Sequence, residues 1–269
     1  MDTLSLRLVP DALWELVEPL VPGFAVRPQG GGTAPLDDRA VFTAVVYVLV
    51  SGCGWRELPT QFGVSVPTAH RRFTDWTKAG LWTRIHHEVL DRLGAQDLID
   101  WSRTVVDAAA IRAKKGGSIT GPSPVDRGKN GSKIHVLVDR AGLPLVVGVS
   151  AANVNDHFAL PVLVRAIPRV RTPRRARRFR PDKLHADKAY DVRETRKWLI
   201  NRGIMVRISR KNIDTSTKLG RHRWVVERTL SWLTNHHRRI GTRWEHHGRN
   251  YLGFLTLAAA LTCFKKLTT

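Results

Sequence analysis

The spacing of apolar residues changes near residue 100, and this change limits the folds that a chain of 269 residues can adopt. Before it, segments such as 81–94 repeat apolar residues every three or four positions, which is typical of amphipathic helices. After it, the runs 103–111, 133–140 and 144–150 are short, rich in β-branched residues and partly alternating, which is typical of strands. We therefore predict an α/β protein, in which an all-α N-terminal region precedes a mixed sheet flanked by helices.

Two domains are expected, a helical region over 1–95 and an α/β domain over 100–269, joined near the change of periodicity. A Gly/Pro-rich segment, 27–38, is predicted to be a linker or loop within the first. In the second domain, helices are predicted over 157–167, about 191–202 (capped by Asp191) and about 221–239, followed by an apolar helix at the end. A short strand that leads into a turn is predicted over 183–190, and another strand over 205–211.

A helix-turn-helix pattern lies inside the helical region. A helix over 55–62, a glycine and a second helix from near Ser65 match the motif whose second helix enters the major groove of DNA. The second helix carries Arg71 and Arg72, which we predict to contact DNA. The same pattern also fits a small helical bundle with a solvated basic face.

The formal charge of +21 predicts a polyanionic partner, nucleic acid before an anionic membrane surface. The charge is unevenly spread, because residues 1–100 have a net charge of −3 and residues 101–269 one of +24. A simple repressor would place its positive charge on the DNA-reading helices, so this distribution argues against one. The arginine-rich segment 169–181 is predicted to be a solvated loop that contacts phosphates.

Several classes of protein are disfavoured. Cys53 and Cys263 stand alone and far apart, which argues against a cysteine-based zinc site or a disulfide framework. The N-terminal segment has an acidic second residue and no basic start, unlike a signal peptide. The apolar stretches 41–50 and 251–264 are too short to span a bilayer. We expect a cytoplasmic, nucleoid-associated protein that does not insert into membranes.

Carboxylates at strand ends stand out in the basic domain. Asp107 and Asp187 each end a predicted strand, and such ends are where sites collect in α/β sheets. Two facing carboxylates favour a hard divalent cation such as Mg²⁺, and a pair of such ions can cleave a phosphodiester. Glu227 is the best candidate for a third ligand. It lies beside the apolar stripe of a predicted helix, where we expect its side chain to turn toward the sheet, and Arg223 lies one turn earlier on the same face. The residues also allow a turn cap at Asp107 and a surface ion pair between Arg223 and Glu227.

Four segments, in this order, closely resemble the transposases of the bacterial insertion-sequence-five (IS-five) family: TVVDAAAIRA, GPSPVDRGKNGSKIHVLVDRAGLPLVVGVSAANVNDH, HADKAYD and RWVVERTLSWL. The resemblance covers about 40–265. It implies an RNase H-like catalytic domain of the DDE type over 100–269 and a DNA-binding region within 1–95.

The resemblance assigns the catalytic, metal-binding triad to Asp107, Asp187 and Glu227. It implies two Mg²⁺ ions, for which Mn²⁺ may substitute, hydrolysis at the ends of the element, and attack of the freed 3′-hydroxyl on target DNA. Related transposases have a Tyr-Arg-Glu-Lys signature around the last acid. Arg223 and Glu227 match it, whereas Gly220 and Thr234 stand in the places of Tyr and Lys.

The expected partner is double-stranded DNA, both element ends and target, and a homodimer or larger assembly is expected because two ends must be held together. The alternatives are a non-catalytic helix-turn-helix regulator and an RNase H-like nuclease that cleaves without joining. Trp198, Trp224, Trp232 and Trp244 are predicted to be packing residues. In addition to Arg71 and Arg72, the residues predicted to bind DNA are Lys129, Lys133, Lys188, Arg223, Arg238 and Arg239.

Overall fold

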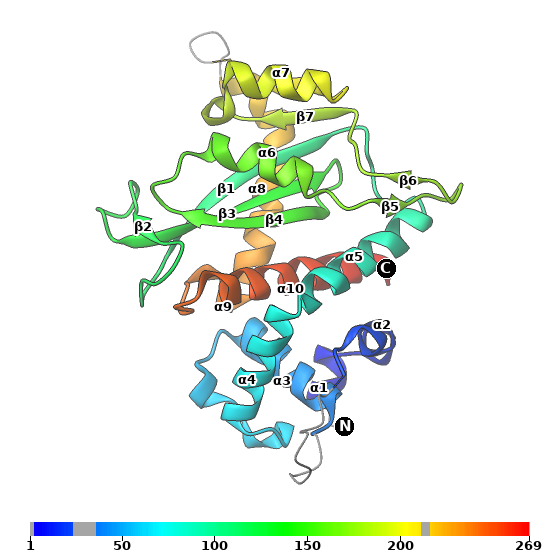
Figure 1. The fold of residues 1–269 in the computed structure, drawn as a ribbon, viewed down its shortest axis with the longest axis vertical. Helices are drawn as coiled ribbons and strands as arrows, with labels where there is room; N and C mark the ends of the chain where they lie inside the picture. The colour runs from blue at the N-terminus through cyan, green and yellow to red at the C-terminus, as the bar shows by residue number, and fades with distance from the viewer. Residues whose placement is uncertain (1–2, 24–35, 211–215, 269) are drawn as a thin grey trace.

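The computed structural model describes residues 3–23, 36–210 and 216–268. Most of the segment 27–38, predicted to be a linker or loop, therefore lies outside the described residues. The described part is an N-terminal group of helices below a mixed sheet, with long helices between them (Figure 1). The predicted α/β fold is confirmed.

The N-terminal helices begin and end largely where the sequence indicates. Asp37 accepts a hydrogen bond from the backbone N–H of Arg39 and caps α3, and Ser65 caps α4 in the same way through the N–H of Thr68. The elements are α1 (Thr3–Leu8), α2 (Asp11–Val17), η1 (Glu18–Leu20), α3 (Asp38–Ser51), η2 (Trp55–Glu57), η3 (Thr60–Phe62), α4 (Val66–Lys78) and α5 (Leu81–Ala95).

The first helix predicted for the helix-turn-helix is wrong. The segment 55–62 forms two single turns of 3-10 helix instead, with Leu58 between them in an extended conformation. Pro59 explains the break, because its ring disfavours the helical region for the preceding residue and its nitrogen has no hydrogen to donate. The second helix, α4, is present as predicted.

The sheet has the strand order β4-β3-β1-β7-β8, with β2 (Gly121–Pro122) pairing the start of β3. The strand β3 (Asn130–Asp139) is antiparallel to both β1 (Thr104–Arg112) and β4 (Pro144–Ala151). The strands β7 (Lys183–Ala186) and β8 (Met205–Ile208) run parallel to β1. Gly142, at φ +95°, lies in the turn between β3 and β4, in a backbone conformation that favours glycine. The mixed sheet that was predicted is thus present.

The connections depart from the sequence prediction in detail. The predicted helix over 157–167 is divided into η4 (Asp156–Phe158) and α6 (Ala159–Arg165), and α7 (Arg193–Asn201) is capped at Val192. Asp191 does not cap it, because its carboxylate accepts a hydrogen bond from Arg196. The predicted loop 169–181 contains a hairpin of β5 (Val170–Arg171) and β6 (Arg177–Arg178). The last elements are η5 (Lys188–Tyr190), α8 (Ser216–Asn235), α9 (Arg238–Gly241) and α10 (Gly248–Leu267).

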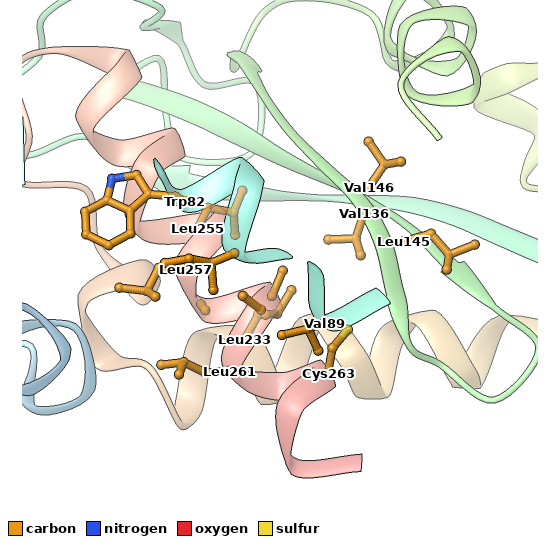
Figure 2. Close-up of a cluster of buried hydrophobic side chains, with 14 of the residues drawn as sticks. Trp82, Val89, Val136, Leu145, Val146, Leu233, Leu255, Leu257, Leu261 and Cys263 are labelled. Carbon is orange, nitrogen blue, oxygen red and sulfur yellow. The ribbon is translucent and has the colours of Figure 1, made fainter. Parts of the chain in front are cut away.

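One buried apolar cluster joins the N-terminal helices to the sheet. The helix α10 is buried over most of its length, as its apolar sequence requires, and it packs against α5 on one side and β4 on the other. Figure 2 shows Trp82 and Val89 of α5 with Leu255, Leu257 and Cys263 of α10. Because side chains of both regions fill the same core, α5 and α10 fix the position of the sheet relative to α4. No helix of the described residues is long and apolar enough to cross a membrane.

Candidate active site

The prediction that Asp107 ends a strand is wrong: Asp107 lies in the middle of β1, opposite Val136 of β3, and its side chain is only 8% exposed. Its Oδ1 accepts a hydrogen bond from the backbone N–H of Ala108 at 2.9 Å. Burial raises the pKa of this carboxyl above its usual value, and the charge of Asp187 adds to the rise, while Ala108 and Arg223 act against it. A buried carboxylate of this kind, kept close to a second one, is typical of a functional site.

Asp187 directly follows β7, and the parallel pairing of β7 with β1 brings it to Asp107. The register pairs Thr104 with Leu184 and Val105 with His185. Asp107 and Asp187 each lie two residues beyond the second pair, so they are neighbours. Asp187 caps η5, because its Oδ1 accepts a hydrogen bond from the N–H of Ala189 at 2.8 Å. The cap leaves its Oδ2 directed toward the cluster, 3.6 Å from Arg223.

Arg223 of α8 stands at the centre of the three predicted acids. Its Nε lies 3.2 Å from Oδ2 of Asp107 and 3.1 Å from Oε1 of Glu227, and its Nη1 lies 3.6 Å from Oδ2 of Asp187. Glu227 reaches it because residues four apart on a helix share a face. The structure thus brings all three predicted acids together from two strands and one helix.

The expectation that Glu227 is turned toward the sheet is wrong. Its side chain is 56% exposed, and it borders the cluster from the solvent side. The apolar stripe of α8, Val226, Leu230 and Leu233, fills the interface with the sheet and leaves Glu227 at its edge. Three carboxylates around one guanidinium leave an excess of negative charge in a strongly basic chain.

The charges of the cluster act on each other. Burial lowers the pKa of Arg223, but the carboxylates of Asp107, Asp187 and Glu227 raise it by more, so the net shift of this pKa is upward. Tyr190, which the sequence analysis did not single out, is buried beside the same acids, and burial followed by the charges of Asp156, Asp107 and Asp187 raises the pKa of its phenol. Its hydroxyl has no hydrogen-bond partner among the described residues. Its position three residues after Asp187 was the only signal in the sequence.

Oxygen ligands from three carboxylates are chemically suited to a hard divalent cation. In the arrangement described here the guanidinium of Arg223 occupies the centre of that donor set. Accordingly, across the described residues no three His, Cys, Asp or Glu side chains lie close enough together to hold a metal ion. The donor chemistry fits such a cation once Arg223 turns away from the acids.

The outer face of α8 beside the cluster carries exposed indole rings. Trp224 is 52% and Trp232 37% exposed, so the prediction that both are packing residues is wrong, as it is for the exposed Trp244. The guanidinium of Arg228 lies over both rings, 4.8 Å from the first and 4.5 Å from the second. Trp198, by contrast, is half-buried, and the guanidinium groups of Arg165 and Arg202 lie over its ring.

The residues predicted to bind DNA fall into two groups. Arg239 is not available for that contact, because it is buried and paired with Glu245 at 2.7 Å. Lys133 is mostly buried and paired with Asp156 at 2.8 Å, and Arg72 is paired with Asp38 and lies over Trp76. The exposed members are Arg71 on α4, Lys129 in the loop before β3, Lys188 next to Asp187, and Arg238 on α9.

Comparisons with known proteins match the two parts of the chain separately. Residues 9–86 match a family described as "Putative transposase of IS4/5 family", and residues 101–263 match the family described as "Transposase DDE domain". The putative transposase for insertion sequence element IS402 of Burkholderia cepacia is 40% identical over 148 residues, which are 55% of this chain and 70% of that protein. An IS402 uncharacterized 16.2 kDa protein is 41% identical over 119 residues, 44% of this chain and 81% of that protein.

Among solved structures, a piggyBac transposase synaptic complex with hairpin DNA aligns with 98% of this chain and 74% of that chain, at a TM-score of 0.49 and 9% identity. A pre-cleavage Mos1 transpososome aligns at a TM-score of 0.29. At these values the assignment of the fold rests on the strand order and not on the alignments.

Proposed function

Because this chain belongs to the DDE transposases of the insertion-sequence-five family, we propose that Asp107, Asp187 and Glu227 bind two Mg²⁺ ions and catalyse cleavage of DNA at the ends of its element and joining of the freed 3′-hydroxyl to target DNA. The observation that supports this is the convergence of the three carboxylates on Arg223 at 3.1–3.6 Å. When bound, the ions supply an activated attacking oxygen and stabilise the leaving oxygen of the phosphodiester.

The protein's own residues hold the reacting groups. Asp107 is fixed within the sheet and Asp187 by its cap, so two of the ligands are preorganised, whereas Glu227 is free to adjust from the solvent side. When no cation is bound, the positive charge of Arg223 offsets part of the negative charge of the three carboxylates. Once released from them, its guanidinium can bind an oxygen of the scissile phosphate in a bidentate manner.

The proposal extends to partners and place. Duplex DNA carries the phosphates that the charge of +21 attracts, and two copies of the chain would hold the two ends of one element. Residues 1–95 would bind the terminal repeats through α4 and Arg71, and residues 100–269 would carry the chemistry. The protein would act in the bacterial cytoplasm, on the nucleoid.

The test uses a supercoiled plasmid that carries the DNA flanking the reading frame on both sides. Wild-type protein is expected to nick or cut it with Mg²⁺ or Mn²⁺, and to join a pre-cleaved end to a second duplex. Asp107→Asn and Asp187→Asn are expected to bind the same DNA and cut none. Normal cutting by these variants would disprove the triad.

The remaining outcomes separate the alternatives. Binding without cutting by the wild-type protein under every metal condition would favour the non-catalytic regulator. Cutting without joining would favour the nuclease. Short inverted repeats at the two ends of the flanking DNA would support the transposase independently of any assay.

A further inference from the structure

A cluster of arginines lies at the opposite end of β7 from Asp187, apart from the carboxylate site. A hollow of about 540 Å³ opens there between the β5–β6 hairpin and the start of β8. Its lining includes Arg177, Arg178, Arg180, Arg202, Phe179 and Asp182. Asp182 precedes β7 and Asp187 follows it, so the hollow is roughly 16 Å from the carboxylates at the strand rise of about 3.3 Å per residue.

The hairpin that carries Arg177 and Arg178, two of the four arginines, is fixed to α5. Asp91, whose side chain is 16% exposed, accepts hydrogen bonds from the backbone N–H of Arg171 at 3.0 Å and from Arg177 at 2.9 Å. Gly94, one turn further along α5, packs directly on Val170 and on the carbonyl of Arg171, where a Cβ would clash with both. The hairpin, and Arg177 with it, is therefore held by a rigid support that fixes one wall of the hollow.

Two of the arginines have no acidic partner. Arg177 pairs with Asp91 and Arg178 with Asp182, but within the described ranges no carboxylate pairs with Arg180 or Arg202. Arg180 donates to the carbonyl of Arg202 at 3.3 Å, and Arg202 stacks on Trp198 at 4.4 Å. Both guanidinium groups are exposed and oriented, and their charge is not neutralised within the described residues.

We propose that this hollow binds the backbone phosphates of duplex DNA at a distance from the bond that is cut. Guanidinium groups bind phosphate oxygens in a bidentate manner, and a duplex presents one negative charge for about every 1.7 Å of its axis. Because the carboxylates lie at the other end of β7, the phosphate held here is not the one that reacts. The proposal rests on the proposed function, and it adds a site that holds DNA and does not cut it.

The test measures how binding depends on salt. A labelled duplex is titrated in EDTA, so that no cutting occurs, with wild-type protein and with the double variant Arg180→Gln/Arg202→Gln. Each phosphate contact contributes about 0.9 to the slope of log affinity against log salt, so the double variant is expected to lower that slope by about 2.

Matched variants control for loss of charge and for loss of fold. Arg92→Gln/Arg140→Gln removes the same charge from exposed arginines that already pair with Glu88 and Asp100, and it is expected to leave the slope near that of the wild type. Arg180→Lys/Arg202→Lys keeps the charge and is expected to restore most of the slope. The thermal unfolding temperature of each variant shows that the fold is intact, which the exposure of both arginines favours.

The outcomes distinguish this proposal from the proposed function. If the wild type cuts DNA, Asp107→Asn does not, and Arg180→Gln/Arg202→Gln keeps the wild-type slope, the hollow is not a DNA site while the transposase assignment stands. An equal loss of slope in the Arg92/Arg140 control would also overturn the proposal, because it would show a general effect of charge. If the wild type binds no duplex, both proposals fail.

Discussion

Two of the clusters that arginine and carboxylate side chains form in the described residues differ in burial and in the balance of their charges. At the edge of the sheet, Arg223 faces Asp107, Asp187 and Glu227, whose side chains range from 8% to 56% exposed. On α9 and in the segment that joins it to α10, Arg239, Arg243 and Glu245 are all buried. The first cluster has an excess of negative charge and the second an excess of positive charge.

The surroundings of the second cluster explain why its charge is tolerated. Arg243 donates to the backbone carbonyls of Ile119 and Glu245, both at 2.9 Å, and to the hydroxyl of Ser132 at 2.6 Å, and Arg239 donates to the carbonyl of Cys53 at 2.8 Å. These bonds connect α9 and the segment before α10 to three distant parts of the chain: the N-terminal helices, the loop after β1, and β3. The guanidinium groups of the second cluster find their acceptors within the chain, and the one unpartnered oxygen among its described side chains, Oε2 of Glu245, is buried. The first cluster leaves carboxylate oxygens for a ligand, since Glu227 is 56% exposed. Four predictions test this difference.

The largest effect on stability is expected at Arg243. Arg243→Met leaves several buried carbonyls without a donor, and it is expected to lower the free energy of unfolding by about 3–5 kcal/mol. Urea denaturation measures the change, and Arg243→Lys, which keeps the charge but cannot span the same acceptors, is expected to fall between. A loss no larger than that of a surface ion pair would show that the two clusters do not differ in this way.

Substitution at Asp107 is expected to act in the opposite direction. Asp107→Asn removes a buried charge that Asp187 opposes, and it is expected to raise the free energy of unfolding by about 0.5–2 kcal/mol, as substitutions of strained site residues often do. The same variant is expected to lose metal-dependent cutting. Urea denaturation measures the change in stability, and the plasmid assay measures the loss of cutting. A destabilised variant would contradict the conclusion that the buried charge of Asp107 is unfavourable.

The gain at Asp107 is expected to depend on pH. The pKa of Asp107 is raised in the folded state, mainly by burial, so its protonated form favours folding. Its contribution to stability is present below the pKa of the unfolded chain and is lost as pH rises through the folded pKa. The difference in unfolding temperature between Asp107→Asn and the wild type should therefore widen from acid to neutral pH. A difference that stays constant with pH would rule out this cause.

The smallest effect on stability is expected at Glu227. Its ion pair with Arg223 is half-exposed, and pairs of this kind contribute about 0.5 kcal/mol or less. Glu227→Gln is therefore expected to unfold like the wild type and to cut no DNA. Glu88→Gln breaks the equivalent i, i+4 pair with Arg92 on α5, and it is expected to change neither property. Cutting by Glu227→Gln at the wild-type rate would remove Glu227 from the site.

Local patterns predicted most of the fold. The apolar spacing located α5 and the strands β1, β3 and β4, because burial on one face imposes a period that is visible in any window of the sequence. The errors lie where a few residues compete. Pro59 divides a predicted helix into two 3-10 turns, and Asp91 and Gly94, far from residues 169–181 in the sequence, hold a predicted loop as a hairpin.

The site was predicted in part. The placement of Asp107 and Asp187 on predicted strands, with the resemblance of four segments to the family, indicated the three acids that the structure brings together, although only Asp187 lies at the end of its strand. The burial of Arg239 and the exposure of Trp224 were not predictable, because each depends on which helix packs against that position.

The sequence by itself determined the family, the order of the elements and the identity of the acids, since these depend on residue type and local spacing. Only the tertiary structure decided that Arg223 lies among three carboxylates, that Arg243 is satisfied by carbonyls from distant segments, and that Arg180 and Arg202 face a hollow without an acidic partner. The physical reason is that the energy of a charge depends on its burial and on its neighbours, and both are set by contacts between segments far apart in the chain.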